Sequence, residues 1–161
     1  FYADPMFAHY HDAAREHGFP FGAYQFFRPN DSAIGQVNFF LLTCLGRLGT
    51  LISMVDVEED SFHNNSDSVD ERIAKLHIVC QAIEAKQDGK PVLIYTNEDT
   101  WDSYMGGTDA FAGHPLWLAG NPMPQGFSKA LIRQYGQGMV PGISVAVDLD
   151  ELDGDLSVLS R

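Results

Sequence analysis

The sequence is short of basic residues. Its 161 residues include 10 Lys and Arg against 22 Asp and Glu, which gives a formal net charge of −12. Nucleic acids and anionic lipid surfaces are bound through clustered Lys and Arg side chains, whereas the basic residues here are scattered. The composition therefore argues against a nucleic-acid or membrane partner and favours a substrate with an uncharged backbone, such as a sugar or a peptide.

Cysteine and long apolar runs are also scarce. The two cysteines, Cys44 and Cys80, both lie within apolar helical patterns, which favours buried free thiols over a disulfide or a metal site. No apolar run approaches the length of a transmembrane helix, and the first residues do not form a basic and then apolar signal sequence.

Common catalytic and metal-binding motifs are missing as well. His9 and His11 are two residues apart in a helical pattern, so they face different ways and form no metal-ligand pair. No G-x-S-x-G motif offers a serine nucleophile. We therefore predict neither a metal nor a cofactor.

The apolar pattern predicts an α/β protein. Ser68 and Glu71 form a capping-box pattern, and a stripe of apolar residues follows them toward Gly89. Alternating strands and helices at this spacing predict βαβ units and a parallel sheet, whereas the later connections are too short for full crossover helices. The expected helices are 4–17, 32–45 and 68–89, and the expected strands are 21–27, 50–57, 91–96, 115–120, 130–136 and 143–149.

Acidic residues follow the strand expected at 50–57. If that strand continues through Asp56-Val57-Glu58, both carboxylates point to one side, and their mutual repulsion raises one pKa enough to retain a proton for acid catalysis. The alternative is a solvated acidic turn, because Glu59 and Asp60 continue the run. Asp148 near the end of the last expected strand is a third candidate, although the tail that follows it is simply acidic.

Aromatic residues occur near the ends of several expected strands. Rings at the mouth of a barrel can stack on sugar faces, but an aromatic residue in a strand is more often part of the core. The candidates are Tyr24, Phe26, Tyr95, Trp117 and Tyr135.

Five segments occur in an order that resembles glycoside hydrolase family 25, the lysozyme-like muramidases of bacteria, phages and fungi. They are "YADPMFAHYHDAAREHGFPFGAYQFF", "MVDVE", "PVLIYT", "LWLAG" and "IRQYG...GISVAVDLDELDG". The resemblance implies a TIM-like barrel with five β/α units followed by three strands. It also implies hydrolysis of the β-1,4 bond between N-acetylmuramic acid and N-acetylglucosamine in peptidoglycan.

The same resemblance assigns roles to residues. Glu58 is expected to be the general acid, Asp56 to position or stabilise the reacting sugar, and Asp148 to match the aspartate of the family's last strand. Tyr24, Tyr95 and Trp117 are expected to line the sugar cleft. Gln25, which stands where many members have His, is a further substrate-binding candidate together with Phe26 and Tyr135.

The sequence also departs from the family pattern. The first two barrel strands, with an Asp-x-Ser whose aspartate belongs to the active site, would precede Phe1, so we expect residues 1–161 to be one catalytic domain that is N-terminally incomplete. A muramidase is expected to act outside the cell or on the cell wall after secretion or phage delivery. The alternative function is a catalytically impaired relative that binds cell-wall glycan.

Overall fold

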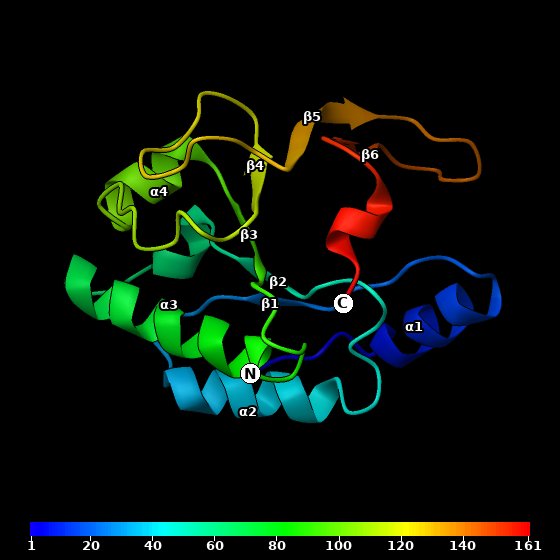
Figure 1. Ribbon diagram of the computed structural model, residues 1–161, viewed down its shortest axis with the longest axis horizontal. Helices are drawn as coiled ribbons and strands as arrows, with labels where there is room; N and C mark the ends of the chain where they lie inside the picture. The colour runs from blue at the N-terminus through cyan, green and yellow to red at the C-terminus, as the bar shows by residue number, and fades with distance from the viewer.

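The computed structural model describes all residues from Phe1 to Arg161 and is built around one six-stranded sheet with the strand order β1-β2-β3-β4-β5-β6 (Figure 1). The strands are β1 (Tyr24–Phe26), β2 (Met54–Asp56), β3 (Leu93–Thr96), β4 (Leu116–Ala119), β5 (Ile132–Gly138) and β6 (Val147–Leu152). The α-helices are α1 (Phe7–Glu16), α2 (Ala33–Thr43), α3 (Val69–Glu84) and α4 (Glu98–Tyr104), and two 3₁₀-helices are η1 (Glu59–Phe62) and η2 (Leu156–Leu159). All six expected strands and all three expected helices are present, with shorter bounds in most cases.

Strands β1 to β5 pair in parallel, as the βαβ spacing predicts, but β6 pairs antiparallel to β5. The last strand also begins later than the expected 143–149. An eight-residue connection, 139–146, is too short to return the chain for a parallel crossover, so it closes a hairpin instead. Asp148 is therefore the second residue of β6 rather than one near its end.

The sheet has one face covered by helices. Alternate strand residues such as Val55 and Ile94 join a cluster of 18 buried apolar residues that includes side chains from α2 and α3. Helix α3 begins with the predicted capping box, in which the Ser68 hydroxyl accepts from the Glu71 N–H and the Glu71 carboxylate accepts from the Ser68 N–H. Both cysteines are buried and free on this side, as predicted.

The opposite face, which we call the inner face, holds a smaller apolar cluster. Ile52, Leu93 and Ile132 contact Leu159 of η2 there. The backbone fixes this closure, because the Ile52 N–H donates to the Leu159 carbonyl at 2.8 Å and the Arg161 N–H donates to the Thr50 carbonyl at 2.8 Å. Figure 1 shows η2 lying against this side of the sheet, so the C-terminal segment closes the inner face at the amino ends of the strands.

The sheet is open at both edges, since β1 and β6 each pair with one neighbour only. The six strands thus form an open, mostly parallel sheet. A largely apolar cavity of about 780 Å³ lies along β1, between α1 and α2. No helix is both long enough and apolar enough to span a lipid bilayer.

Candidate active site

Strand β2 places the two central carboxylates on the inner face. Asp56 is its last residue, and the following Val57 is fully buried in the helix-side cluster. Because side chains alternate along an extended segment, Asp56 and Glu58 lie on the side opposite Val57. Asp56 is also in register with Phe26 of β1 and Tyr95 of β3, which therefore share its face. This arrangement matches the strand-end interpretation of Asp56 and Glu58.

Asp56 is almost fully buried, with 9% of its surface exposed. Its Oδ1 atom has no hydrogen-bond partner within the protein. Burial, and next the negative charge of Glu58, raise the pKa of Asp56 from 3.8 to about 7. Burial contributes more to this shift than the mutual repulsion on which the expectation rested, and it favours the protonated form of Asp56.

Glu58 lies closer to solvent, at the junction between β2 and η1. Its side chain is half-buried, and its backbone N–H donates to the Ser61 hydroxyl at 3.2 Å, which fixes the start of η1. The next two acids, Glu59 and Asp60, are exposed. The solvated-turn interpretation therefore applies to Glu59 and Asp60, whereas Asp56 and Glu58 face inward.

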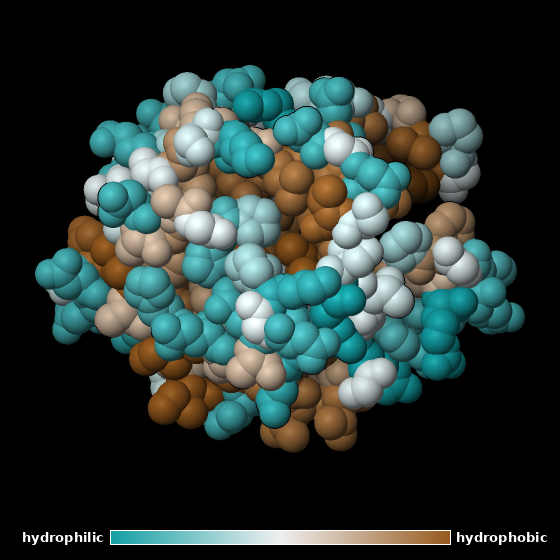
Figure 2. Space-filling view, viewed as in Figure 1, coloured by the Kyte–Doolittle hydropathy of each residue, from teal (hydrophilic) through white to brown (hydrophobic).

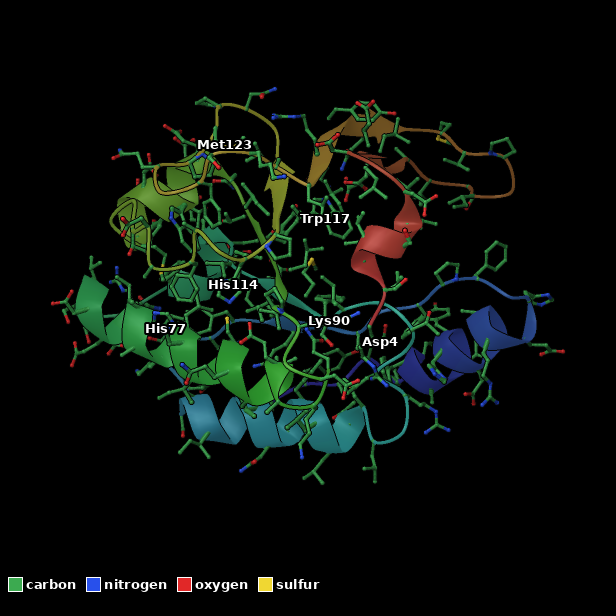
Figure 3. All side chains as sticks on the ribbon, in the orientation of Figure 1. Asp4, His77, Lys90, His114, Trp117 and Met123 are labelled. Atoms are coloured by element: carbon green, nitrogen blue, oxygen red, sulfur yellow. The ribbon has the colours of Figure 1, made fainter.

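Two aromatic side chains stand beside the carboxylates on the inner face. Tyr95 and Trp117 occupy neighbouring register positions on β3 and β4, and their rings meet edge to face with centroids 5.8 Å apart. Burial raises the pKa of Tyr95 to about 12, with further contributions first from Glu58 and then from Asp56. Figure 3 shows Trp117 in the space between β4 and η2, whereas His77 and His114 lie beside α3.

Tyr24 completes this group from the edge strand β1. Its side chain is largely exposed, and burial of its remaining part and the charge of Asp56 raise the pKa of its hydroxyl. Phe26, two residues further along β1, is in register with Asp56 and half-buried. Five predicted site residues, Tyr24, Phe26, Asp56, Tyr95 and Trp117, therefore meet on one face.

Two polar residues that were not among the predicted site residues accept hydrogen bonds from Tyr95 and Trp117. Gln134 of β5 accepts a hydrogen bond from the Tyr95 hydroxyl at 2.8 Å, and Asp150 of β6 accepts one from the Trp117 indole at 2.7 Å. Gln134 and Asp150 are themselves register partners. In the sequence, Asp150 belongs to an acidic tail with no sign of a specific role. The antiparallel pairing of β6 with β5 places it on the inner face, beside Trp117.

Asp148 reaches the same end of the sheet for the same reason. The start of an antiparallel strand lies beside the carboxyl ends of its parallel neighbours, and Asp148 is the register partner of Gln137 near the end of β5. Its carboxylate accepts a hydrogen bond from Gln137 Nε2 at 2.9 Å. The charges of Asp148 and Asp150 also contribute to the raised pKa of Tyr95, so both acids lie near the cluster.

Two other predicted residues lie elsewhere. Gln25 alternates with Tyr24 and Phe26, so its buried side chain points to the opposite face, where it donates to Gln36 of α2 at 3.0 Å. Tyr135 is the extra residue of a bulge in β5 and is 61% exposed without a side-chain hydrogen bond. Neither residue joins the carboxylate cluster. No group of three or more His, Cys, Asp or Glu side chains is arranged to hold a metal ion.

The surface around the inner face is hollowed. Figure 2 shows apolar side chains at the bottom of a depression between β4 and the C-terminal segment, with hydrophilic side chains around its rim. A depression with an apolar floor, aromatic rings and a few converging acids is suited to a carbohydrate, whose ring faces are apolar and whose edges are polar.

Residues 1–138 match the sequence profile of "Glycosyl hydrolases family 25". The chain belongs to this family. Among curated proteins it is similar to the uncharacterized protein YegX of Escherichia coli K12, with 28% identity over 160 residues. That match covers 97% of the chain and 56% of YegX, so the chain spans about half the length of the curated relatives it matches.

Solved structures have the same fold. A bacterial lysozyme from Streptomyces coelicolor superposes with a TM-score of 0.83 at 25% identity, covering 99% of this chain and 79% of that one. The spore cortex lytic enzyme SleM of Clostridium perfringens superposes with a TM-score of 0.85 at 22% identity, covering 99% of this chain and 57% of that one. The fold expected from the resemblance, an α/β sheet of the family 25 type, is therefore confirmed.

Proposed function

We propose that this family 25 chain is a peptidoglycan hydrolase that cleaves the β-1,4 bond between N-acetylmuramic acid and N-acetylglucosamine. The observation that carries the proposal is the position of Asp56 and Glu58 side by side at the carboxyl end of β2, facing Tyr95 and Trp117. Active sites of parallel α/β barrels lie at this end of the strands. Family membership and the similarity to a bacterial lysozyme support the same substrate class.

In the proposed reaction, Glu58 donates a proton to the glycosidic oxygen as the bond from that oxygen to the anomeric carbon breaks. Water then adds to the anomeric carbon, and its proton returns to Glu58. Glycosidases of this kind use a pair of acidic residues around the scissile bond. Glu58 is assigned the acid role because it lies nearer the opening, where a leaving sugar is accessible, whereas Asp56 lies deeper.

Asp56 is proposed to orient or stabilise the reacting sugar. Its Oδ1 atom has no partner in the protein and is free to interact with the acetamido group or with the positive charge that develops at the ring. Asp148 lies farther along the same edge and adds negative charge there. Tyr24, Phe26, Tyr95 and Trp117 are proposed to contact the sugar faces.

A carboxamide substitution tests the role of Glu58. Glu58→Gln keeps the shape of the side chain but cannot donate an acidic proton, so release of reducing ends from purified cell walls should fall by at least about 100-fold. Glu59→Gln, a change of an exposed neighbouring acid, serves as the matched control and should retain activity. Circular dichroism of both variants should match that of the unsubstituted protein. Unchanged turnover in Glu58→Gln would rule out the assignment.

Sedimentation with insoluble peptidoglycan, combined with the reducing-end assay, separates hydrolysis from binding alone. A glycan-binding relative without activity would sediment with the peptidoglycan but release no reducing ends at any pH. The proposed site of action is the cell wall, because that is where the proposed substrate occurs.

A further inference from the structure

A second, polar cavity lies beside the proposed active site. It has a volume of about 350 Å³ and lies between the loops that follow β1 and β2, at the carboxyl edge of the sheet. All of its lining residues are polar: Arg28, Asn30, Asp60, Ser61, His63 and Asn64. Without an aromatic or apolar wall, this cavity does not offer a stacking surface for a sugar ring.

Hydrogen bonds between the two loops hold the cavity in shape. Asn30 Nδ2 donates to the His63 carbonyl at 2.8 Å, and its Oδ1 accepts from Asn65 Nδ2 at 2.8 Å. Asn65 is held in turn by Arg72 of α3, whose Nε donates to the Asn65 side chain at 2.8 Å. The walls are therefore tied to a helix rather than formed by unsupported loops.

The cavity presents the positive charge of Arg28 and the negative charge of Asp60, which form no ion pair with each other. Arg28 donates from Nε to Asp31 at 2.6 Å, which leaves its two terminal nitrogens without protein acceptors. The Asp60 carboxylate forms no ion pair and accepts no hydrogen bond from the protein. Arg28 can bind a carboxylate through paired N–H groups, and Asp60 can bind an ammonium group.

The position of this cavity links it to the substrate proposed above. Asp60 and Ser61 belong to η1, which begins directly after Glu58. In peptidoglycan, each muramic acid carries a short peptide on its lactyl group, and that peptide has free carboxylates and, at a diamino acid, a free amine. A sugar bound at Asp56 and Glu58 would bring this peptide to the neighbouring loops.

We infer that the cavity is a subsite for the stem peptide of peptidoglycan, in which Arg28 binds a peptide carboxylate and Asp60 binds the peptide amine. This inference rests on the proposed function for its substrate. It makes the protein selective for glycan strands that still carry their peptides.

Two substrates test the subsite: intact peptidoglycan, and glycan strands from which an amidase has removed the peptides. Arg28→Gln and Asp60→Asn should each raise KM for intact peptidoglycan about tenfold, the effect of losing one hydrogen bond to a charged group, with kcat nearly unchanged. Neither variant should change KM for the stripped strands. Lys86→Gln, an exposed charge change on the helix side, is the matched control.

Binding of the free stem peptide provides a readout that does not depend on hydrolysis. A diaminopimelate-containing peptide released by amidase should bind the unsubstituted protein in calorimetry and bind each variant about tenfold more weakly. Asp60→Asn leaves the Arg28–Asp31 pair in place and removes no hydrogen bond or ion pair that the Asp60 side chain makes within the protein, and circular dichroism should confirm an unchanged fold.

The subsite would be overturned if each substitution changed KM equally for intact and for stripped glycan strands. It would also be overturned if the free peptide did not bind, or if neither substitution weakened its binding. If the protein cleaves neither substrate but binds the peptide through Arg28 and Asp60, the proposed hydrolysis fails while the subsite stands.

Discussion

At the scale of single residues, Asp56 is the side chain whose environment most affects its chemistry. Its pKa is raised from 3.8 to about 7 by burial and by the charge of Glu58. Below about pH 4 the carboxyl is protonated in the folded and the unfolded chain, so it does not affect stability. Between about pH 4 and 7 only the unfolded chain releases the proton, and the folded state loses stability as the pH rises.

Asp56→Asn should therefore stabilise the protein at high pH. The variant and the unsubstituted protein should unfold with similar free energies at pH 4, and the variant should become more stable by ~2–4 kcal/mol above about pH 8. Urea unfolding at several pH values measures this difference. Asp153→Asn, a change of an exposed acid, should show no such divergence. Parallel curves for Asp56→Asn would contradict a raised pKa.

Asp150 is expected to act through Trp117. Removing the acceptor of the 2.7 Å hydrogen bond in Asp150→Ala frees the indole ring, so KM for peptidoglycan should rise about three- to tenfold with a smaller change in kcat. Asp150→Asn keeps an acceptor oxygen and should largely restore the KM. Quenching of Trp117 fluorescence by acrylamide should increase in Asp150→Ala, since the other tryptophan, Trp101, is fully buried. An unchanged KM in Asp150→Ala would remove Asp150 from the site.

At the scale of elements, α3 shows how local sequence determines a boundary. Ser68 and Glu71 each satisfy a backbone N–H at the first turn, which otherwise has no partner within the helix. Ser68→Ala should lower the free energy of unfolding by about 1 kcal/mol. Ser66→Ala, an exposed serine two residues earlier with no hydrogen bond, should change it little. Equal effects of the two substitutions in urea unfolding would argue against the cap.

The elements also show why part of the site escaped prediction. Capping residues and apolar stripes are local signals, so α3 and the buried strands β3 and β4 could be predicted from nearby residues. The direction and the start of β6 depend on its pairing with β5 across a bulge, which no local pattern records. Asp150 and Gln134 were missed for this reason, and Asp148 was expected near the end of a strand although it lies near its beginning.

At the scale of the whole molecule, the sheet separates two environments. The helix side holds the larger apolar cluster, whereas the inner face combines a small apolar cluster with the acids and aromatics of the proposed site. Alternation along a strand predicts which of Asp56, Val57 and Glu58 share a face. The same alternation places Gln25 on the helix side, because it lies between Tyr24 and Phe26 in β1. The expectation that Gln25 binds substrate did not apply this rule to the edge strand.

The closure of the inner face by η2 could not be predicted either. Leu159 reaches Ile52 and Leu93 from more than 60 positions away, and the segment that carries it is a single 3₁₀ turn with no apolar periodicity of its own. Contacts of this kind depend on the folded sheet rather than on the sequence near Leu159.

The most direct test of the central claim is the chemical identity of the sugar at the new reducing end. Purified peptidoglycan digested by the protein should be reduced with borohydride and examined by mass spectrometry. Cleavage of the bond from N-acetylmuramic acid to N-acetylglucosamine predicts products that end in reduced muramic acid, absent after treatment with Glu58→Gln. Products that end in reduced glucosamine, or no new ends at all, would contradict the account.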